Sequence, residues 1–288
     1  MTLLDTLVKQ PLVRTFGEPR LRRLLLATPL SEWYWRVAPC LHRQGRHLSP
    51  GYVDPPIDPF QLFLVDPDRI TRFTGRPFPP WVTRWQDFGA VIDGNWDQRR
   101  APPIHPDYEG VDPSLYLAER FSETRLHRGL IDHFVEGVPW QDLDFVNELV
   151  DHVRSTNTAV WQDCSTVAEI RGYCRKLDRL YQDMRERGCL SIRELNRREN
   201  RLLTFRGVME KEILVDLTRT GEPVFVTGRH RLSLAKILGL NRIPVAVVAR
   251  HPEWIARRGK GHPAGPRSGS EGPFGQESTV GDPLNVSW

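Results

Sequence analysis

The spacing of hydrophobic residues changes along the chain and predicts several kinds of element. Residues 166–188, "TVAEIRGYCRKLDRLYQDMRERG", place apolar side chains on one helical face, with a Thr166–Glu169 capping box before them and Gly188 after them. A second capping box, Ser191 with Glu194, opens "SIRELNRRENR". Both segments are therefore predicted to be helices.

Upstream of these helices the pattern is more varied. Asp112 and Pro113 form a helix N-terminus for "SLYLAERFSETRLHRGLIDHF", residues 114–134, and "DLDFVNELVDHVRS" is typical of a further short helix. Residues 51–113 are instead dense in Pro, Asp and Trp. Their short apolar runs, "FQLFLV" and "GAVI", lie between turn signals and predict short strands and loops.

Between residues 212 and 250 the pattern switches between strand and helix periods. "EILVDLT" and "PVFVT" predict two strands joined by a turn at Gly221, "RLSLAKILGL" predicts a helix, and "IPVAVVA" predicts a buried strand. If the second and last of these strands are parallel neighbours, the crossover between them is expected to be right-handed.

The expected fold class is therefore α+β (mixed α/β), with a mostly helical N-terminal part and a C-terminal α/β module. We expect a basic amphipathic segment over 1–50 and Trp-rich loops followed by helices over 51–204. The module then covers 205–256, and a tail rich in Gly, Pro and Ser, expected to be disordered, covers 257–288.

Composition limits the class of protein. Hydrophobic residues are 39% of the chain and charged residues 26%, close to a globular average. No apolar run reaches the roughly 20 residues that a membrane span needs. The N-terminal segment interleaves basic and apolar residues, unlike a secretory signal, which predicts a cytoplasmic protein. The net charge of +4 is compatible with a nucleotide, a nucleic acid or a membrane surface as partner.

The strand-to-helix junction at Gly228 carries the clearest chemistry. Glycine lets the backbone approach a ligand closely, and the first helical N–H groups after it have no partner within the helix. Arg229, His230 and Arg231 add side-chain donors at the same helix end, where the helix dipole favours negative charge. This corner is predicted to bind an anion, most simply a phosphate group.

The pattern Gly228-x-x-Arg231, with Ala235 inside the helix and apolar strands on both sides, resembles the ParB and sulfiredoxin superfamily over about residues 205–254. The resemblance implies nucleotide-linked chemistry. In ParB proteins the matching Gly and Arg lie in a CTP-binding motif, and in sulfiredoxin and ADP-dependent serine kinases the same loop holds nucleotide phosphates. It therefore implies that Gly228, Arg229, His230 and Arg231 surround a phosphate. A Mg²⁺ ion carried in with a nucleotide is compatible with such a site. Arg229 stands where sulfiredoxin has its cysteine, so sulfinic acid reduction is not expected.

Phosphotransfer to a small hydroxyl compound would need a group that takes the hydroxyl proton. His230 and four nearby carboxylates are the candidates, and spacing selects none of them: Glu210, Glu212, Asp216 and Glu222. Arg250 and His251 follow the last strand and are candidate ligand contacts. The chain has neither a Walker A sequence nor a dinucleotide fingerprint, and no His and Cys residues at metal-ligand spacing.

The residues leave open whether the module is an enzyme. One alternative is a nucleic-acid-associated protein in which the corner and a basic run contact backbone phosphates through Arg197, Arg198 and Arg201. The other alternative is an inactive scaffold in which the arginines of the corner make structural salt bridges.

Overall fold

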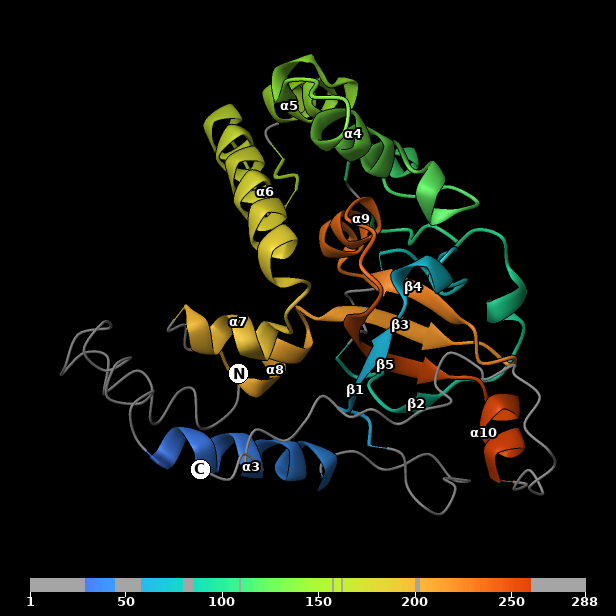
Figure 1. The fold of residues 1–288 in the computed structure, drawn as a ribbon. Coiled ribbons are helices and arrows are strands. Elements are labelled where there is room, and N and C mark those ends of the chain that lie inside the picture. Colours follow the sequence, from blue (N-terminus) through green and yellow to red (C-terminus); the bar gives the residue numbers. More distant parts are fainter. Residues whose placement is uncertain are drawn as a thin grey trace. The chain divides into compact units, whose positions relative to one another are not determined.

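The computed structural model describes residues 29–44, 58–79, 85–108, 110–156, 158–161, 163–199 and 203–259 (Figure 1). The chain divides into two compact units, one of Met1–Leu48 with Ser191–Lys211 and one of Ser49–Leu190 with Glu212–Trp288. The predicted corner lies in the second unit. The fold is mixed α+β, as the sequence predicts.

The sheet of the second unit has five strands among the described residues, in the order β1-β5-β3-β4, with β2 beside one end of β5. β3 and β5 are parallel neighbours at its centre, while β1 pairs antiparallel with β5 and β4 pairs antiparallel with β3. The strands are β1 (Leu62–Val65), β2 (Ala90–Val91), β3 (Ile213–Leu217), β4 (Pro223–Thr227) and β5 (Ile243–Arg250).

The three strands predicted between 212 and 250 are confirmed, but their order adds something that the sequence does not show. β5 pairs with β3 rather than with β4, so the second and last predicted strands are not neighbours. β1 and β2 lie in the runs "FQLFLV" and "GAVI", where short strands are predicted, and they complete the sheet. All residues of β3 and β5 are buried, which explains why both central strands are almost continuously apolar.

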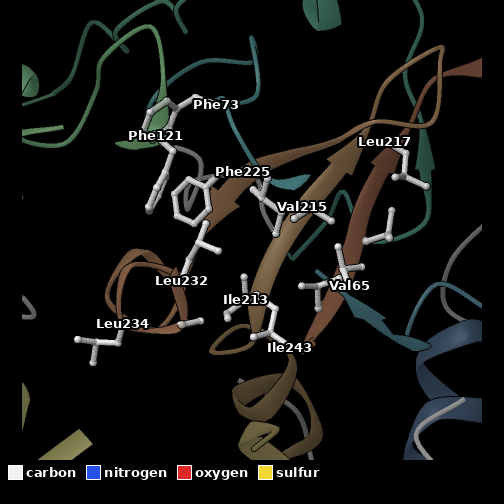
Figure 2. Packing of buried hydrophobic residues seen from close by; sticks show 14 of the residues in the cluster. Val65, Phe73, Phe121, Ile213, Val215, Leu217, Phe225, Leu232, Leu234 and Ile243 are labelled. Atoms are coloured by element: carbon white, nitrogen blue, oxygen red, sulfur yellow. The ribbon is translucent and has the colours of Figure 1, made fainter. Parts of the chain in front are cut away.

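Helix α9 (Arg229–Ile237) packs against this sheet and forms the main core with it (Figure 2). Leu232 and Leu234 of α9 are fully buried, and Phe225 of β4 packs against both Phe73 and Phe121, with ring centroids 5.6 and 5.0 Å away. Each such side chain contributes about 1.5–3 kcal/mol of burial free energy. The core therefore fixes the position of the helix that follows Gly228.

A second core joins α4 (Arg125–Phe134), α5 (Asp144–Thr156) and α6 (Val167–Arg187). α6 is the helix predicted over 166–188: the Thr166–Glu169 capping box is formed, and Gly188 ends it with φ +75°. α5 confirms the short helix predicted near residue 150. Ile237 of α9 packs against both cores, so α9 lies between the sheet and the helices.

The single helix predicted over residues 114–134 is wrong. Asp112 caps only a short 3-10 turn, η5 (Pro113–Leu115), and a second turn, η6 (Phe121–Glu123), precedes α4, which begins at Arg125 with Thr124 as its cap. The reason is tertiary: the Phe121 N–H donates to the Thr71 carbonyl, and the Phe121 ring is buried in the sheet core. The remaining 3-10 turns are η2 (Pro67–Arg69), η4 (Trp96–Gln98) and η7 (Trp140–Asp142).

The first unit contains α3 (Pro29–Gln44), α7 (Ile192–Arg198) and α8 (Phe205–Met209). α7 is confirmed with its Ser191–Glu194 capping box, and the Phe205 N–H donates to the Tyr34 hydroxyl over 2.8 Å. The start of the segment predicted to be amphipathic lies outside the described residues, and so do residues 260–288 of the predicted tail. Within the described ranges, no helix is long and apolar enough to span a membrane. α10 (Pro252–Gly259) extends into the range predicted as tail.

Candidate functional site

Gly228 forms the corner between β4 and α9, and it is needed there for two reasons. Its φ of +94° lies in the left-handed region that favours glycine. A Cβ atom at this position would lie 2.9 Å from the Ile213 Cα and 3.3 Å from the Glu212 carbonyl oxygen. The glycine thus lets the corner pack directly on the start of β3. No side chain caps the N-terminus of α9.

Arg231, the arginine of the Gly228-x-x-Arg231 pattern, points toward the start of β3. Its Nη1 donates to Glu212 Oε2 over 3.2 Å, and its Nη2 donates to the Leu190 carbonyl and lies 3.4 Å from Cys189 Sγ. Burial alone would lower the pKa of Arg231, but the neighbouring Cys189 and Glu212 groups raise it. Arg231 and Glu212 therefore form a compensated buried ion pair that anchors α9.

His230 is buried, and both of its ring nitrogens have partners. The Trp161 indole N–H donates to Nε2 over 2.6 Å, which leaves the ring proton on Nδ1, 3.2 Å from the Tyr173 hydroxyl. Burial, assisted by the positive charge of Arg229, lowers the pKa of His230 to about 3. The ring is therefore neutral near pH 7, and its lone pair is already occupied. This geometry makes His230 a positioning residue between α6 and α9.

Arg229 differs in its partners from Arg72, Arg76, Arg219 and Arg231. Its guanidinium carbon lies 4.0 Å from the centroid of the Tyr116 ring and 5.7 Å from that of Phe78. Among the described residues, no carboxylate lies within ion-pair distance of it, whereas Arg72, Arg76, Arg219 and Arg231 each have one.

The aromatic surroundings of Arg229 do not neutralise its charge. Burial raises the pKa of Tyr116 and of Tyr173, and it raises that of Tyr108 to about 12, so all three phenols are uncharged. Burial lowers the pKa of Arg229 itself, although arginine retains its proton in proteins. The result is a cation enclosed by rings and hydroxyl groups, without an anion in the described part of the chain.

The predicted carboxylates are held by other partners. Asp216 is fully buried and accepts from Thr74 Oγ1 over 2.7 Å, from Arg76 Nε over 2.8 Å and from the Ala249 N–H over 3.0 Å. Glu222 binds Arg72 through both oxygens, at 3.1 and 2.8 Å. In the first unit, Glu210 accepts from Arg206 Nε over 2.9 Å.

The residues predicted after the last strand lie at a different place from the carboxylates of β3 and β4. Arg250 is the last residue of β5 and is 1% exposed. His251 Nε2 lies 3.0 Å from the Gly94 carbonyl, and its Nδ1 accepts from the Glu253 N–H over 3.3 Å. These contacts connect the end of β5 to the loop around Gly94 and to the start of α10.

Sequence reasoning missed the aromatic partners of the corner, Tyr116, Trp161 and Tyr173. Trp161 and Tyr173 bind His230 from 69 and 57 residues away in the chain. Trp161 adopts φ +44°, which few non-glycine residues do, and this turn directs its indole toward the corner. No short-range sequence pattern predicts contacts between residues this far apart in the chain.

The other predicted groups lie elsewhere or give no cluster. Arg197 and Arg198 are exposed in the last turn of α7, and Arg201 lies outside the described residues. In the ranges that the structure describes, no three His, Cys, Asp or Glu side chains converge to hold a metal ion.

Comparisons of the chain with protein-family models, with curated proteins and with solved structures find no match.

Proposed function

We propose that the corner at the start of α9 binds the phosphate group of a nucleotide or of a phosphorylated small molecule, with Arg229 as the principal contact. The observation that carries this proposal is the charge of Arg229, which has no carboxylate partner among the described residues although it is largely enclosed. An enclosed cation is costly unless it is paired, and a bound anion would supply the pair.

Two further features support a phosphate as the anion. α9 is nine residues long, and its N-terminus has no side-chain cap, so its first N–H groups and its dipole remain for a ligand. The pattern Gly228-x-x-Arg231 resembles the ParB and sulfiredoxin superfamily, in which the same loop holds nucleotide phosphates. In this chain we assign the phosphate contact to Arg229, because Arg231 is bound to Glu212.

We propose binding, without assigning phosphotransfer to a residue. A phosphotransferase needs a base within hydrogen-bond reach of the acceptor hydroxyl. Glu212, Asp216 and Glu222 each form an ion pair with an arginine. The Nε2 lone pair of His230 already accepts a hydrogen bond from the Trp161 indole. A Mg²⁺ ion, if the nucleotide carries one, would be held largely by the phosphates themselves.

A scaffold without a bound nucleotide is the second candidate. It is favoured by the structural contacts of Gly228, His230 and Arg231, which hold α9 to β3 and α6 whether or not a ligand is present. A nucleic-acid phosphate could also meet Arg229, since it offers the same chemistry as a nucleotide phosphate.

The experiment that separates these candidates is a melting-temperature panel. Purified protein is heated with ATP, ADP, CTP or GTP, each with Mg²⁺, and with a DNA duplex. A ligand that binds the folded state raises the melting temperature by mass action. A rise with one nucleotide supports the proposal, a rise with DNA alone that is lost in Arg229→Gln supports the nucleic-acid alternative at this corner, and no rise in any sample supports the scaffold.

A further inference from the structure

A row of three arginines lies along the exposed face of α6. Arg171, Arg175 and Arg179 follow one another at intervals of four residues, and all three are exposed. Residues four apart on an α-helix lie on the same side, one turn above each other. The three guanidinium groups therefore form one continuous basic row, about 12 Å long between the first and last Cα atoms.

Within the described part of the chain, none of the three arginines has an ion pair. The four acidic residues of α6 are engaged elsewhere: Glu169 closes the capping box, Asp178 accepts from Trp140 and lies 3.0 Å from His133 Nε2, and Asp183 and Glu186 both pair with Arg187. Like charges four residues apart destabilise a helix. The row thus has an electrostatic cost that a polyanion would remove.

The rest of this face is compatible with a close-lying partner. Ala168 and Gly172 lie beside the row, and the nearest atom to a Cβ built on Gly172 is the Arg175 guanidinium at 3.8 Å. No large side chain therefore blocks access to the arginines at these two positions. The apolar residues of α6 lie on the opposite face, where Ile170, Cys174 and Leu177 are buried in the helical core.

The side chains of this face decide between two classes of polyanion. A helix that lies on a membrane inserts large apolar residues beside its basic ones. The polar and small neighbours of the row supply no such anchor: Ala168, Gly172, Lys176, Asp178, Gln182 and Asp183. A nucleic-acid backbone needs no apolar anchor, carries a phosphate every ~3.4 Å along each strand, and matches the two-pronged geometry of arginine.

We propose that the row Arg171, Arg175 and Arg179 binds the phosphate backbone of a nucleic acid, independently of base sequence. The surface is distinct from the Arg229 corner, because α6 directs Tyr173 toward His230 from another side of the helix. The inference does not depend on whether Arg229 binds a nucleotide.

The test uses the full chain and a fluorescently labelled duplex of about 20 base pairs, with binding followed by anisotropy. If three phosphates are contacted, binding should weaken about 40-fold between about 50 and about 200 mM salt. The variant Arg171→Gln/Arg175→Gln/Arg179→Gln should lower the slope of log K against log salt by about 3. Glutamine keeps the helix propensity and relieves the repulsion within the row, so circular dichroism should not change and the melting temperature should not fall.

Two controls make the result specific. The triple variant Arg69→Gln/Arg100→Gln/Arg128→Gln removes the same charge from exposed positions elsewhere and should keep the wild-type salt slope. Arg229→Gln should also keep it, which separates this surface from the nucleotide corner. Equal duplex affinity and salt slope in the wild type and the α6 variant would overturn the proposal, as would binding of labelled polyglutamate as tightly as of the duplex.

Discussion

The Arg229 guanidinium carbon lies 4.0 Å from the centre of the Tyr116 ring. Two residues later, Arg231 donates to buried Glu212. Successive residues of a helix are rotated by about 100°, so these two arginines necessarily leave α9 in nearly opposite directions. One holds the helix to the strand before it, and the other faces an aromatic enclosure. The difference in partners yields different predictions for the two positions.

Removing the charge of Arg231 should destabilise the protein. Arg231→Met would leave Glu212 buried without its cation, at a cost of about 3–5 kcal/mol in the free energy of unfolding. The double variant Arg231→Met/Glu212→Leu should regain most of this loss, because no buried charge is then left alone. Urea unfolding measures both values. A stable single variant that has lost only its ligand affinity would show that Arg231 serves the ligand instead.

Gly228 should tolerate no side chain. Gly228→Ala adds the cost of a left-handed alanine, about 1–2 kcal/mol, and also forces a Cβ against the Ile213 backbone. Gly239, after the other end of α9, has φ +62° with nothing within 4 Å of a built Cβ. Gly239→Ala is therefore the matched control and should cost only the conformational term. Equal losses at both positions in urea unfolding would argue against close packing at the corner.

Stability should fall in mild acid because of two buried histidines. Burial, assisted by nearby positive charge, lowers the pKa of His127 to about 4 and that of His230 to about 3. The unfolded chain, with a histidine pKa of about 6.5, therefore takes up these protons first as the pH falls. The stabilising contribution of the two neutral histidines is complete above pH ~6.5. As the pH falls toward 4, the free energy of unfolding decreases by up to about 1.4 kcal/mol per pH unit for each histidine.

The pH effect is measured by urea unfolding at pH values from about 4 to about 7. His127 Nδ1 has no hydrogen-bond partner in the described structure, so His127→Phe removes the titrating group without breaking a bond of that nitrogen. This variant should show a shallower fall between pH ~6.5 and ~4 than the wild type. An unchanged slope would mean that the imidazole is not excluded from protonation in the folded state.

The Trp161 indole should matter to the stability of the corner. Trp161→Phe keeps a ring in the helical core but removes the donor to His230 Nε2, leaving a buried acceptor without its partner. The expected cost is about 1–3 kcal/mol from this group, in addition to the effect of the smaller ring. Phe145, whose ring also contacts Trp161, offers Phe145→Leu as a packing control that leaves the hydrogen bond in place. The free energy of unfolding of the two variants should depend differently on pH, because only Trp161→Phe makes His230 easier to protonate.

Local pattern predicted much of the fold and failed where distant contacts override it. The capping boxes at Thr166 and Ser191 and the strand and helix periods after residue 212 are confirmed. The helix predicted through Phe121 is interrupted because that ring is drawn into the sheet core. The order of the strands, with β1 beside β5, depends on pairing between segments about 180 residues apart and has no local signal.

The candidate site could be located but not resolved from sequence. Gly228 and the three residues after it mark the corner correctly as the start of a helix. Sequence could not distinguish the free cation from the paired one, because the buried partner of Arg231 and the aromatic partners of Arg229 come from separate parts of the chain. Asp216 and Glu222 likewise look available in sequence and are paired in the structure.

Anion binding at Arg229 is measured by calorimetric titration of three ligands: CTP with Mg²⁺, ATP with Mg²⁺, and pyrophosphate. Each ligand is titrated into the wild type, Arg229→Gln and the exposed control Arg128→Gln. We predict that at least one of these anions binds the wild type and the control equally, and that Arg229→Gln weakens it about 10- to 100-fold, the effect of losing one charge-assisted contact of about 1.5–3 kcal/mol. Equal affinity in Arg229→Gln and the wild type would contradict the account, as would the absence of binding by the wild type at millimolar ligand.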